Sequence, residues 1–371
     1  MKKNVSIEVL RIIACILVIM AHIQLHPVQD GIVINGRLIF SAIIADNVPI
    51  FFLITGFYMF KDIKTDHDIL TVYRRKIKDV IIKLWIPAFI VAIISCYLEK
   101  RFYGKEEIDW LQLWNFVFKL QAGGNFGHLW YICTYIKIII WFPLFALLCQ
   151  NQEIKNKIRR LFIIASLSCV FLNDLEYVIG KDFTNFSDLF FNYHVIYIFL
   201  GYELSLFLKD DKNENSKLYV GGVVFILSII MKVCMQKIMY SINGVWIDNR
   251  FLWLESFLCY FSSCSIFCFW YSLRKNLKEN KIIFWLGKYT FYIYLFHILI
   301  INMTPSIKEK INSWHLGENF ISTIFYYVEY GALIFLLSLI ISIPFEKIYH
   351  LLITKIGKIL FLIKSKKQYN K

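Results

Sequence analysis

Charged residues are scarce in this sequence, and no long polar stretch interrupts it. Of the 371 residues, only 18% are charged and 58% are hydrophobic, and the mean hydropathy is +0.56. A chain of this size with so few polar residues is too apolar to be a soluble protein. No repeat period is evident, and no polar stretch marks a soluble appendage. We therefore expect residues 1–371 to form one membrane domain.

Several motifs of catalytic and metal-binding proteins are also missing. The nine cysteines form no CxxC pair and all lie in or beside apolar segments. We therefore expect them to pack between helices, without a disulfide or zinc framework and without a metal cofactor. There is no GxSxG elbow and no convincing Cys–His pair, so covalent catalysis has no support. The first apolar segment is not a signal peptide, because Glu8 and Arg11 interrupt it and no small-residue cleavage site follows.

Apolar segments long enough to cross a bilayer as helices fill most of the chain. The sequence therefore predicts an all-α polytopic membrane protein with about ten transmembrane helices. The expected spans lie near residues 6–26, 38–60, 80–98, 128–149, 160–179, 189–208, 219–240, 251–271, 282–302 and 323–344. Between the third and fourth spans, bulky residues recur at helical spacing over 108–120, which predicts a short helix that lies flat at the outer interface or packs over the bundle.

The net charge of +14 is unevenly distributed. In a soluble protein it would suggest a nucleic-acid partner, but here most Lys and Arg lie in the loops on one side. These are the N-terminus, residues 61–79, 150–160, 209–217 and 272–281, and the tail after 345. An even number of spans puts both termini on the same side, so the positive-inside rule predicts that the N- and C-termini are cytoplasmic. No nucleic acid is expected as a partner.

The first span contains two side chains that lipid would not dissolve, Arg11 and His22. Eleven residues at about 100° each are roughly three turns plus 20°, so both side chains point the same way, about 16 Å apart. Burying such groups costs several kcal/mol unless a partner or polar cavity receives them. Imidazole is a good general base, and a buried guanidinium suits an anionic or carbonyl oxygen. Arg11 also has a simpler candidate role, an ion pair with Glu8 at i−3.

Other polar side chains are expected at a similar depth, near the outer ends of other spans. They are His128, Trp130, Tyr294, His297 and Glu255. Polar groups at one depth on different helices are typical of a site inside a bundle, where they could position an acceptor or stabilise an oxyanion. Each histidine alone is also compatible with a helix cap or an interfacial residue.

On the inner side, a basic cluster precedes the third span. Its members Arg74, Arg75, Lys76 and Lys78 could bind the phosphates of a cytoplasmic donor or could simply face anionic lipid. The second span carries Pro49 and Gly56, which could bend the helix, allow close helix contact or open a cavity.

These residues resemble the signature of the acyltransferase-3 family of integral membrane O-acyltransferases. The resemblance rests on an ordered set of motifs: Arg-x10-His in the first span, residues 48–57, the basic segment before Pro87, residues 128–131, 200–202, 286–297 and 344–347. The resemblance extends over nearly the whole chain. More narrowly, the chain is similar to bacterial surface-polysaccharide acetyltransferases that lack a fused periplasmic domain. One departure is that residues 75–78 read Arg-Lys-Ile-Lys, where the family often has Arg-x-x-Arg.

The resemblance implies an O-acetyltransferase of the bacterial cytoplasmic membrane. Acetyl-CoA would be the cytoplasmic donor, and the acceptor would be a hydroxyl of an extracytoplasmic, cell-surface glycan. His22 would be catalytic, Arg11 would hold the donor, and Arg74, Arg75 and Lys78 would contact its phosphates. The expected partners are membrane lipid and the glycan, and a homo-oligomer is left open. The alternative is a transporter or exporter of a glycan or small solute that uses the same buried charges.

Overall fold

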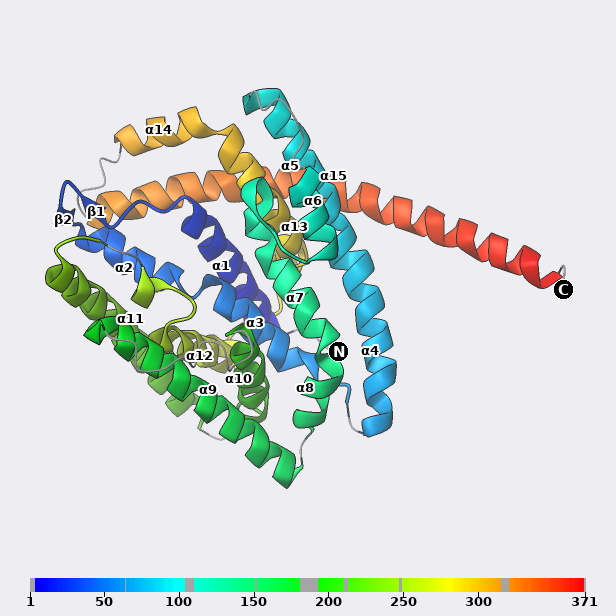
Figure 1. The fold of residues 1–371 in the computed structure, drawn as a ribbon, viewed down its shortest axis with the longest axis horizontal. Coiled ribbons are helices and arrows are strands. Elements are labelled where there is room, and N and C mark those ends of the chain that lie inside the picture. The colour runs from blue at the N-terminus through cyan, green and yellow to red at the C-terminus, as the bar shows by residue number, and fades with distance from the viewer. Residues whose placement is uncertain are drawn as a thin grey trace.

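The computed structural model describes residues 4–63, 65–103, 110–150, 152–180, 193–209, 213–246, 249–314 and 320–369. In these residues the chain forms a helical bundle with one short β-hairpin (Figure 1). The helices are α1 (Val5–His22), α2 (Asn35–Ile44), α3 (Asn47–Met59), α4 (Asp66–Val80), α5 (Ile86–Tyr103), α6 (Trp110–Phe118), α7 (Trp130–Ile140), α8 (Phe142–Leu148), α9 (Glu153–Ile179), α10 (His194–Phe207), α11 (Glu214–Asn243), α12 (Phe257–Ser272), α13 (Lys281–Met303), α14 (Pro305–Trp314) and α15 (Phe320–Tyr369).

The hairpin connects α1 to α2. Strand β1 (Val28–Gln29) pairs antiparallel with β2 (Ile32–Val33). The two turn residues between them, Asp30 and Gly31, have φ angles of 51° and 76°. A two-residue hairpin turn with positive φ at both positions favours Asp-Gly, so the local sequence explains this reversal.

The expected all-α membrane architecture is confirmed. In the described part of the chain, eight helical segments are long and apolar enough to cross a membrane, and the pair α7 and α8, bent by 65°, makes up to nine. Each lies at one of the predicted spans. The remaining prediction, 189–208, coincides with the 14-residue apolar helix α10, and residues 189–192 lie outside the described residues. The number ten and the cytoplasmic location of both termini stay predictions.

Helix α1 lies inside the bundle, where it packs against α3, α13 and α15. Helix α3 is packed in turn against α10 at two glycines. A Cβ atom on Gly56 would come within 3.0 Å of the Ile198 carbonyl oxygen, and one on Gly201 within 3.0 Å of the Leu53 carbonyl oxygen. Glycine therefore allows these two backbones to approach closely, as expected for membrane helices.

A buried ion pair holds the break between α2 and α3. Asp46 lies at this break, and its Oδ1 accepts a bond from Lys232 Nζ of α11 at 3.1 Å. The hydroxyls of Ser262 and Ser263 of α12 donate to the same oxygen at 2.5 and 2.7 Å, and Cys259 Sγ lies 3.2 Å away. Both charged side chains are fully buried. The start of α3 is thus fixed to α11 and α12 by one carboxylate.

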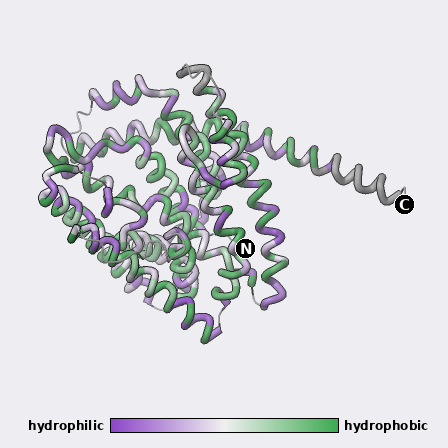
Figure 2. The backbone as a smooth tube through the Cα atoms, viewed as in Figure 1, coloured by the Kyte–Doolittle hydropathy of each residue, from purple (hydrophilic) through white to green (hydrophobic). Residues whose placement is uncertain are grey.

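Apolar side chains dominate the bundle helices, whereas α4 and α14 are more hydrophilic (Figure 2). Helices α9 and α11 bury few of their apolar residues inside the protein, as lipid-facing helices do. Helix α6 falls within the segment predicted to be helical, residues 108–120, of which 108 and 109 are outside the described residues. Trp110, Trp114 and Phe118 of α6 are exposed, while Leu113 and Phe116 are buried. Its flat position at the interface stays a prediction. The C-terminal part of helix α15 projects away from the bundle (Figure 1).

Candidate functional site

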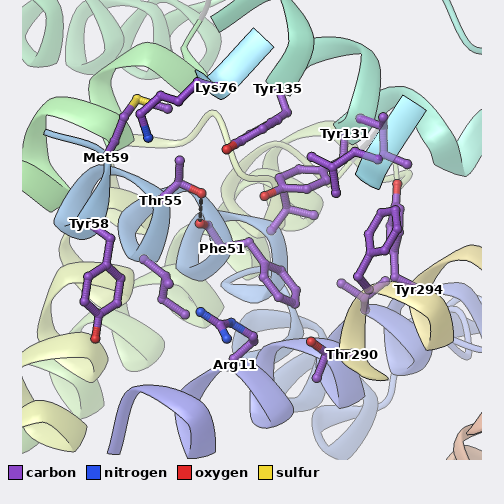
Figure 3. Close-up of a pocket in the computed structure, with 16 residues that line it drawn as sticks. Arg11, Phe51, Thr55, Tyr58, Met59, Lys76, Tyr131, Tyr135, Thr290 and Tyr294 are labelled. Atoms are coloured by element: carbon purple, nitrogen blue, oxygen red, sulfur yellow. Dashed lines mark hydrogen bonds between the residues drawn. The ribbon is translucent and has the colours of Figure 1, made fainter. Parts of the chain in front are cut away.

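A cavity of about 350 Å³ lies between α1, α3, α4, α7 and α13 (Figure 3). Six of its lining residues come from α3, so the glycine contacts and the ion pair that fix α3 also fix one cavity wall. The lining residues are Arg11 and Val18 of α1; Val48, Phe51, Ile54, Thr55, Tyr58 and Met59 of α3; Lys76 of α4; Leu84; Tyr131, Ile132 and Tyr135 of α7; and Thr290, Phe291 and Tyr294 of α13.

Arg11 lies on the cavity wall, and its guanidinium uses only one nitrogen for the predicted ion pair with Glu8. Nη1 of Arg11 donates to Oε1 and Oε2 of Glu8 at 2.9 and 2.8 Å. Among the described residues, the other guanidinium nitrogens, Nε and Nη2, have no hydrogen-bond partner. The ion pair with Glu8 is therefore compatible with a role of Arg11 in ligand binding, because the pair leaves Nε and Nη2 free to donate to a ligand.

Apart from Lys76, the rest of the lining is apolar with a small set of hydroxyl groups. In the view of Figure 3, Phe51 and Thr290 appear on one side of Arg11 and Tyr58 on the other, and Tyr131 and Tyr294 appear farther from Arg11. Such a wall suits an extended chain that carries isolated polar groups, because it gives apolar contact and a few hydrogen bonds at once. The hydroxyl-bearing side chains are Thr55, Tyr58, Tyr131, Tyr135, Thr290 and Tyr294.

Three histidines predicted from the sequence meet beyond the Tyr294 end of the cavity. The ring centroid of His297 on α13 lies 5.1 Å from that of His22 at the end of α1. It lies 5.4 Å from that of His128, which precedes α7. His128 and His297 are buried, whereas His22 is exposed. The three rings therefore lie close together, while their common depth in the membrane stays a prediction.

Hydrogen bonds fix the tautomers of the two buried rings. Nδ1 of His297 lies 2.6 Å from the Tyr294 carbonyl oxygen, and Nε2 of His128 lies 3.3 Å from the Leu295 carbonyl oxygen. A carbonyl can only accept, so these ring nitrogens donate and the opposite nitrogens carry the lone pairs. In the described structure, His297 Nε2 and His128 Nδ1 are buried without a partner. No group of three His, Cys, Asp or Glu among the described residues has the geometry to hold a metal ion.

Arg11, Val18 and His22 form one stripe along α1, as their spacing predicts. Arg11 and Val18 line the cavity, but His22 does not. The side chain that reaches both regions is Tyr294. It lines the cavity, and its ring centroid lies 5.7 Å from His297 and 6.0 Å from His128. The Tyr294 hydroxyl donates to the His128 carbonyl oxygen. One aromatic side chain thus lies between the Arg11 cavity and the histidines.

Two other residues predicted for the site lie beside different partners. Trp130 packs next to His194 of α10, with ring centroids 5.2 Å apart. Glu255 interacts electrostatically with Arg250 and Tyr193. No contact among the described residues joins it to the three histidines. His194 itself was missed by the sequence reasoning. Its position at the start of an apolar helix is a signal that could have drawn attention to it.

The basic residues of α4 are divided between the surface and the cavity. Arg74, Arg75 and Lys78 are exposed, and Arg75 pairs with Asp62 at 2.5 Å. Lys76 is half-buried and lines the cavity, with its ammonium 5.3 Å from the Phe142 ring centroid. The buried residues of α4 are Ile69, Val72 and Val80. Position 76 falls on the same face, so helical spacing could have separated Lys76 from its neighbours.

A second cation lies beside a cavity residue, outside the spans. Nζ of Lys61 is 4.3 Å from the ring centroid of Tyr58, a cavity residue. Partial burial lowers the pKa of the Lys61 amine. In the part of the chain that the structure describes, Lys76 forms no ion pair with a carboxylate. An unpaired ammonium that is partly removed from water favours an anionic ligand.

Comparison with known proteins identifies the family. Residues 4–344 match the family described as "Acyltransferase domain". No curated protein and no solved structure is significantly similar to the chain. The match includes α1 with Arg11 and His22, the cavity helices and the three histidines. The chain therefore belongs to the acyltransferase-3 family and contains a membrane acyltransferase domain.

Proposed function

We propose that the protein transfers an acetyl group from cytoplasmic acetyl-CoA to a hydroxyl of an extracytoplasmic glycan in the bacterial cytoplasmic membrane. The observation that supports this most is the continuity from Arg11 through Tyr294 to the three histidines. A thioester donor has anionic phosphates, a long arm with isolated amides and a reactive carbonyl. The site offers cations, an apolar wall with hydroxyls, and imidazole groups in that order.

The donor would enter at the end of the cavity that carries Lys76. Lys76 and Lys61 would contact the diphosphate, and the exposed trio Arg74, Arg75 and Lys78 would attract the donor electrostatically from solution. The pantetheine arm would then pass Arg11, because this side chain has free donors for a carbonyl oxygen. The thioester would come to lie near Tyr294.

His22 would act as the general base. In the proposed reaction the acceptor oxygen forms a bond to the thioester carbonyl carbon while His22 takes the hydroxyl proton. The resulting oxyanion would accept a hydrogen bond from the Tyr294 hydroxyl, released from the His128 carbonyl. The carbon–sulfur bond then breaks, and the proton held by His22 passes to the departing thiolate. His22 is the exposed member of the histidine group, so it is the one that an external acceptor can reach.

The test compares His22→Ala with His26→Ala, which serves as a matched control. His26 is exposed, bonds to the Val28 carbonyl and lies beside Trp246, away from the cavity. In membranes supplied with acetyl-labelled acetyl-CoA, loss of the general base should lower transfer to envelope glycans about 10²- to 10⁴-fold. His26→Ala should retain the wild-type rate.

Equal transfer by wild type and a correctly inserted His22→Ala protein would contradict the assigned role of His22. Mass spectrometry of envelope glycans, from cells with and without the gene, tests the acceptor class. If no glycan gains an acetyl group, the glycan acceptor is wrong. Glycan uptake by vesicles in the absence of any acyl donor would instead support the transporter hypothesis.

A further inference from the structure

Gly287 of α13 faces Glu8 of α1 at very short range. A Cβ atom at position 287 would come within 3.0 Å of Glu8 Oε2. The next nearest atoms are Cδ and Cβ of the same glutamate, at 3.2 and 3.5 Å. The space that a side chain at 287 would take is therefore occupied by the Glu8 carboxylate, which is itself buried.

We infer that Gly287 and Glu8 are positioning residues for Arg11, which they hold on the cavity wall to bind an uncharged carbonyl of the donor. This inference rests on the proposed function and names the part of the donor that Arg11 contacts. Gly287 provides room for the carboxylate, and the carboxylate fixes the guanidinium through Nη1.

The ion pair decides which ligand Arg11 prefers. Both oxygens of Glu8 lie within 2.9 Å of Nη1, so the negative charge largely cancels the positive one inside the bundle. A phosphate at this point would gain little from the pair and would be repelled by Glu8. The free N–H groups of Arg11 can still donate to a neutral amide or thioester oxygen. The anionic part of the donor is thus left to the unpaired Lys76.

The Gly287→Ala substitution tests the positioning of Arg11 without preventing the protein from folding. The atom that an alanine side chain would meet first is the far end of a flexible glutamate, which can move without shifting the backbone. Alanine also favours a helix more than glycine does. We therefore expect Gly287→Ala to fold and insert, but with the carboxylate displaced and the contacts at 2.8 and 2.9 Å lost.

The experiment is a double-mutant cycle of Gly287→Ala and Glu8→Ala in purified protein in lipid nanodiscs. The dissociation constants of acetyl-CoA and of the phosphate-free fragment S-acetylpantetheine are measured. Each single substitution should raise both constants about tenfold, since a charge-assisted hydrogen bond contributes about that factor. The double variant should match Glu8→Ala alone, because only Glu8 Cβ, at 3.5 Å, would remain beside the alanine.

Gly222→Ala is the matched control, because its Cβ would make only ordinary contacts with Phe269 at 3.5 and 3.7 Å. It should leave both constants unchanged. Additive effects of the two substitutions, or wild-type binding by Gly287→Ala, would overturn the inference.

The same double-mutant cycle can be measured by thermal unfolding, which needs no ligand. This measurement distinguishes a failure of this inference from a failure of the proposed function. If neither ligand binds to the wild type, the proposed donor is wrong. The change in unfolding temperature on Gly287→Ala should still be more favourable in the Glu8→Ala background than in wild type. Equal changes in the two backgrounds would show that Gly287 and Glu8 are not coupled.

Discussion

Lys76 is expected to bind the donor phosphates, and Lys76→Met tests this directly. Methionine keeps the length and apolar contacts of the side chain but removes the ammonium that faces the cavity. A hydrogen bond to a charged group contributes about 1.5–3 kcal/mol, which is about 10- to 150-fold in affinity. Lys76 is half-buried, so solvent and salt screen it less than they screen the exposed cations of α4.

The assay is titration calorimetry of the protein in nanodiscs with two ligands. Acetyl-CoA should bind to Lys76→Met at least about tenfold more weakly than to wild type. S-acetylpantetheine lacks phosphate and should bind to both equally. Arg75→Met is the matched control, because Arg75 is exposed and already paired with Asp62; it should weaken acetyl-CoA less than about threefold.

Two results would refute this reasoning. A larger loss in Arg75→Met than in Lys76→Met would move the phosphate site to the exposed face of α4. Equal weakening of both ligands in Lys76→Met would mean that the substitution disturbs the cavity as a whole rather than one ionic contact.

Two further predictions concern the anchoring of α3, and thermal unfolding of the purified protein measures both. Asp46→Ala should lower the unfolding free energy by about 3–5 kcal/mol, because it leaves Lys232 buried without its carboxylate. The double variant with Lys232→Met should recover much of this loss. If the double variant recovers none of it, the importance of the pair is refuted. Gly201→Ala should destabilise by about 1–3 kcal/mol, since its Cβ would meet the Leu53 carbonyl oxygen of a rigid backbone, whereas Gly222→Ala should not. A Gly201→Ala protein with the same unfolding free energy as wild type would contradict the close approach of α3 and α10.

Features that depend on local helix geometry could be predicted from the sequence. The apolar segments form helices at the expected places. Arg11 and His22 lie in one continuous helix, so an eleven-residue spacing puts them on one face, although only Arg11 lines the cavity. The Glu8–Arg11 pair is also local, three residues apart on one helix. These predictions needed only the rise and rotation of an α-helix.

Features that depend on which helices become neighbours could be predicted only in part. The criterion of similar depth selected His22, His128 and His297, whose rings lie close together, but it also selected Glu255, for which the described residues show no contact with them. Depth is one coordinate, and contact requires that the helices also be adjacent.

The buried partners that stabilise the site left no signal in a single sequence. Asp46 and Lys232 are 186 positions apart, and nothing local marks them as a pair. Gly287 falls within the motif 286–297, but its contact with Glu8 becomes visible only when α1 is placed against α13. Lys76 differs, because helical spacing alone places it on the same face of α4 as the buried Ile69, Val72 and Val80.

The ion pair between Asp46 and Lys232 also connects the largely exposed helix α11 to the helix that forms one wall of the cavity. Helix α11 exposes most of its apolar length, so its tilt follows the thickness of the surrounding hydrocarbon. Lys232 ties this helix to the first residue before α3, which supplies six cavity residues. A thinner or thicker lipid mixture is therefore expected to alter turnover through a helix that contributes no described residue to the lining of this cavity.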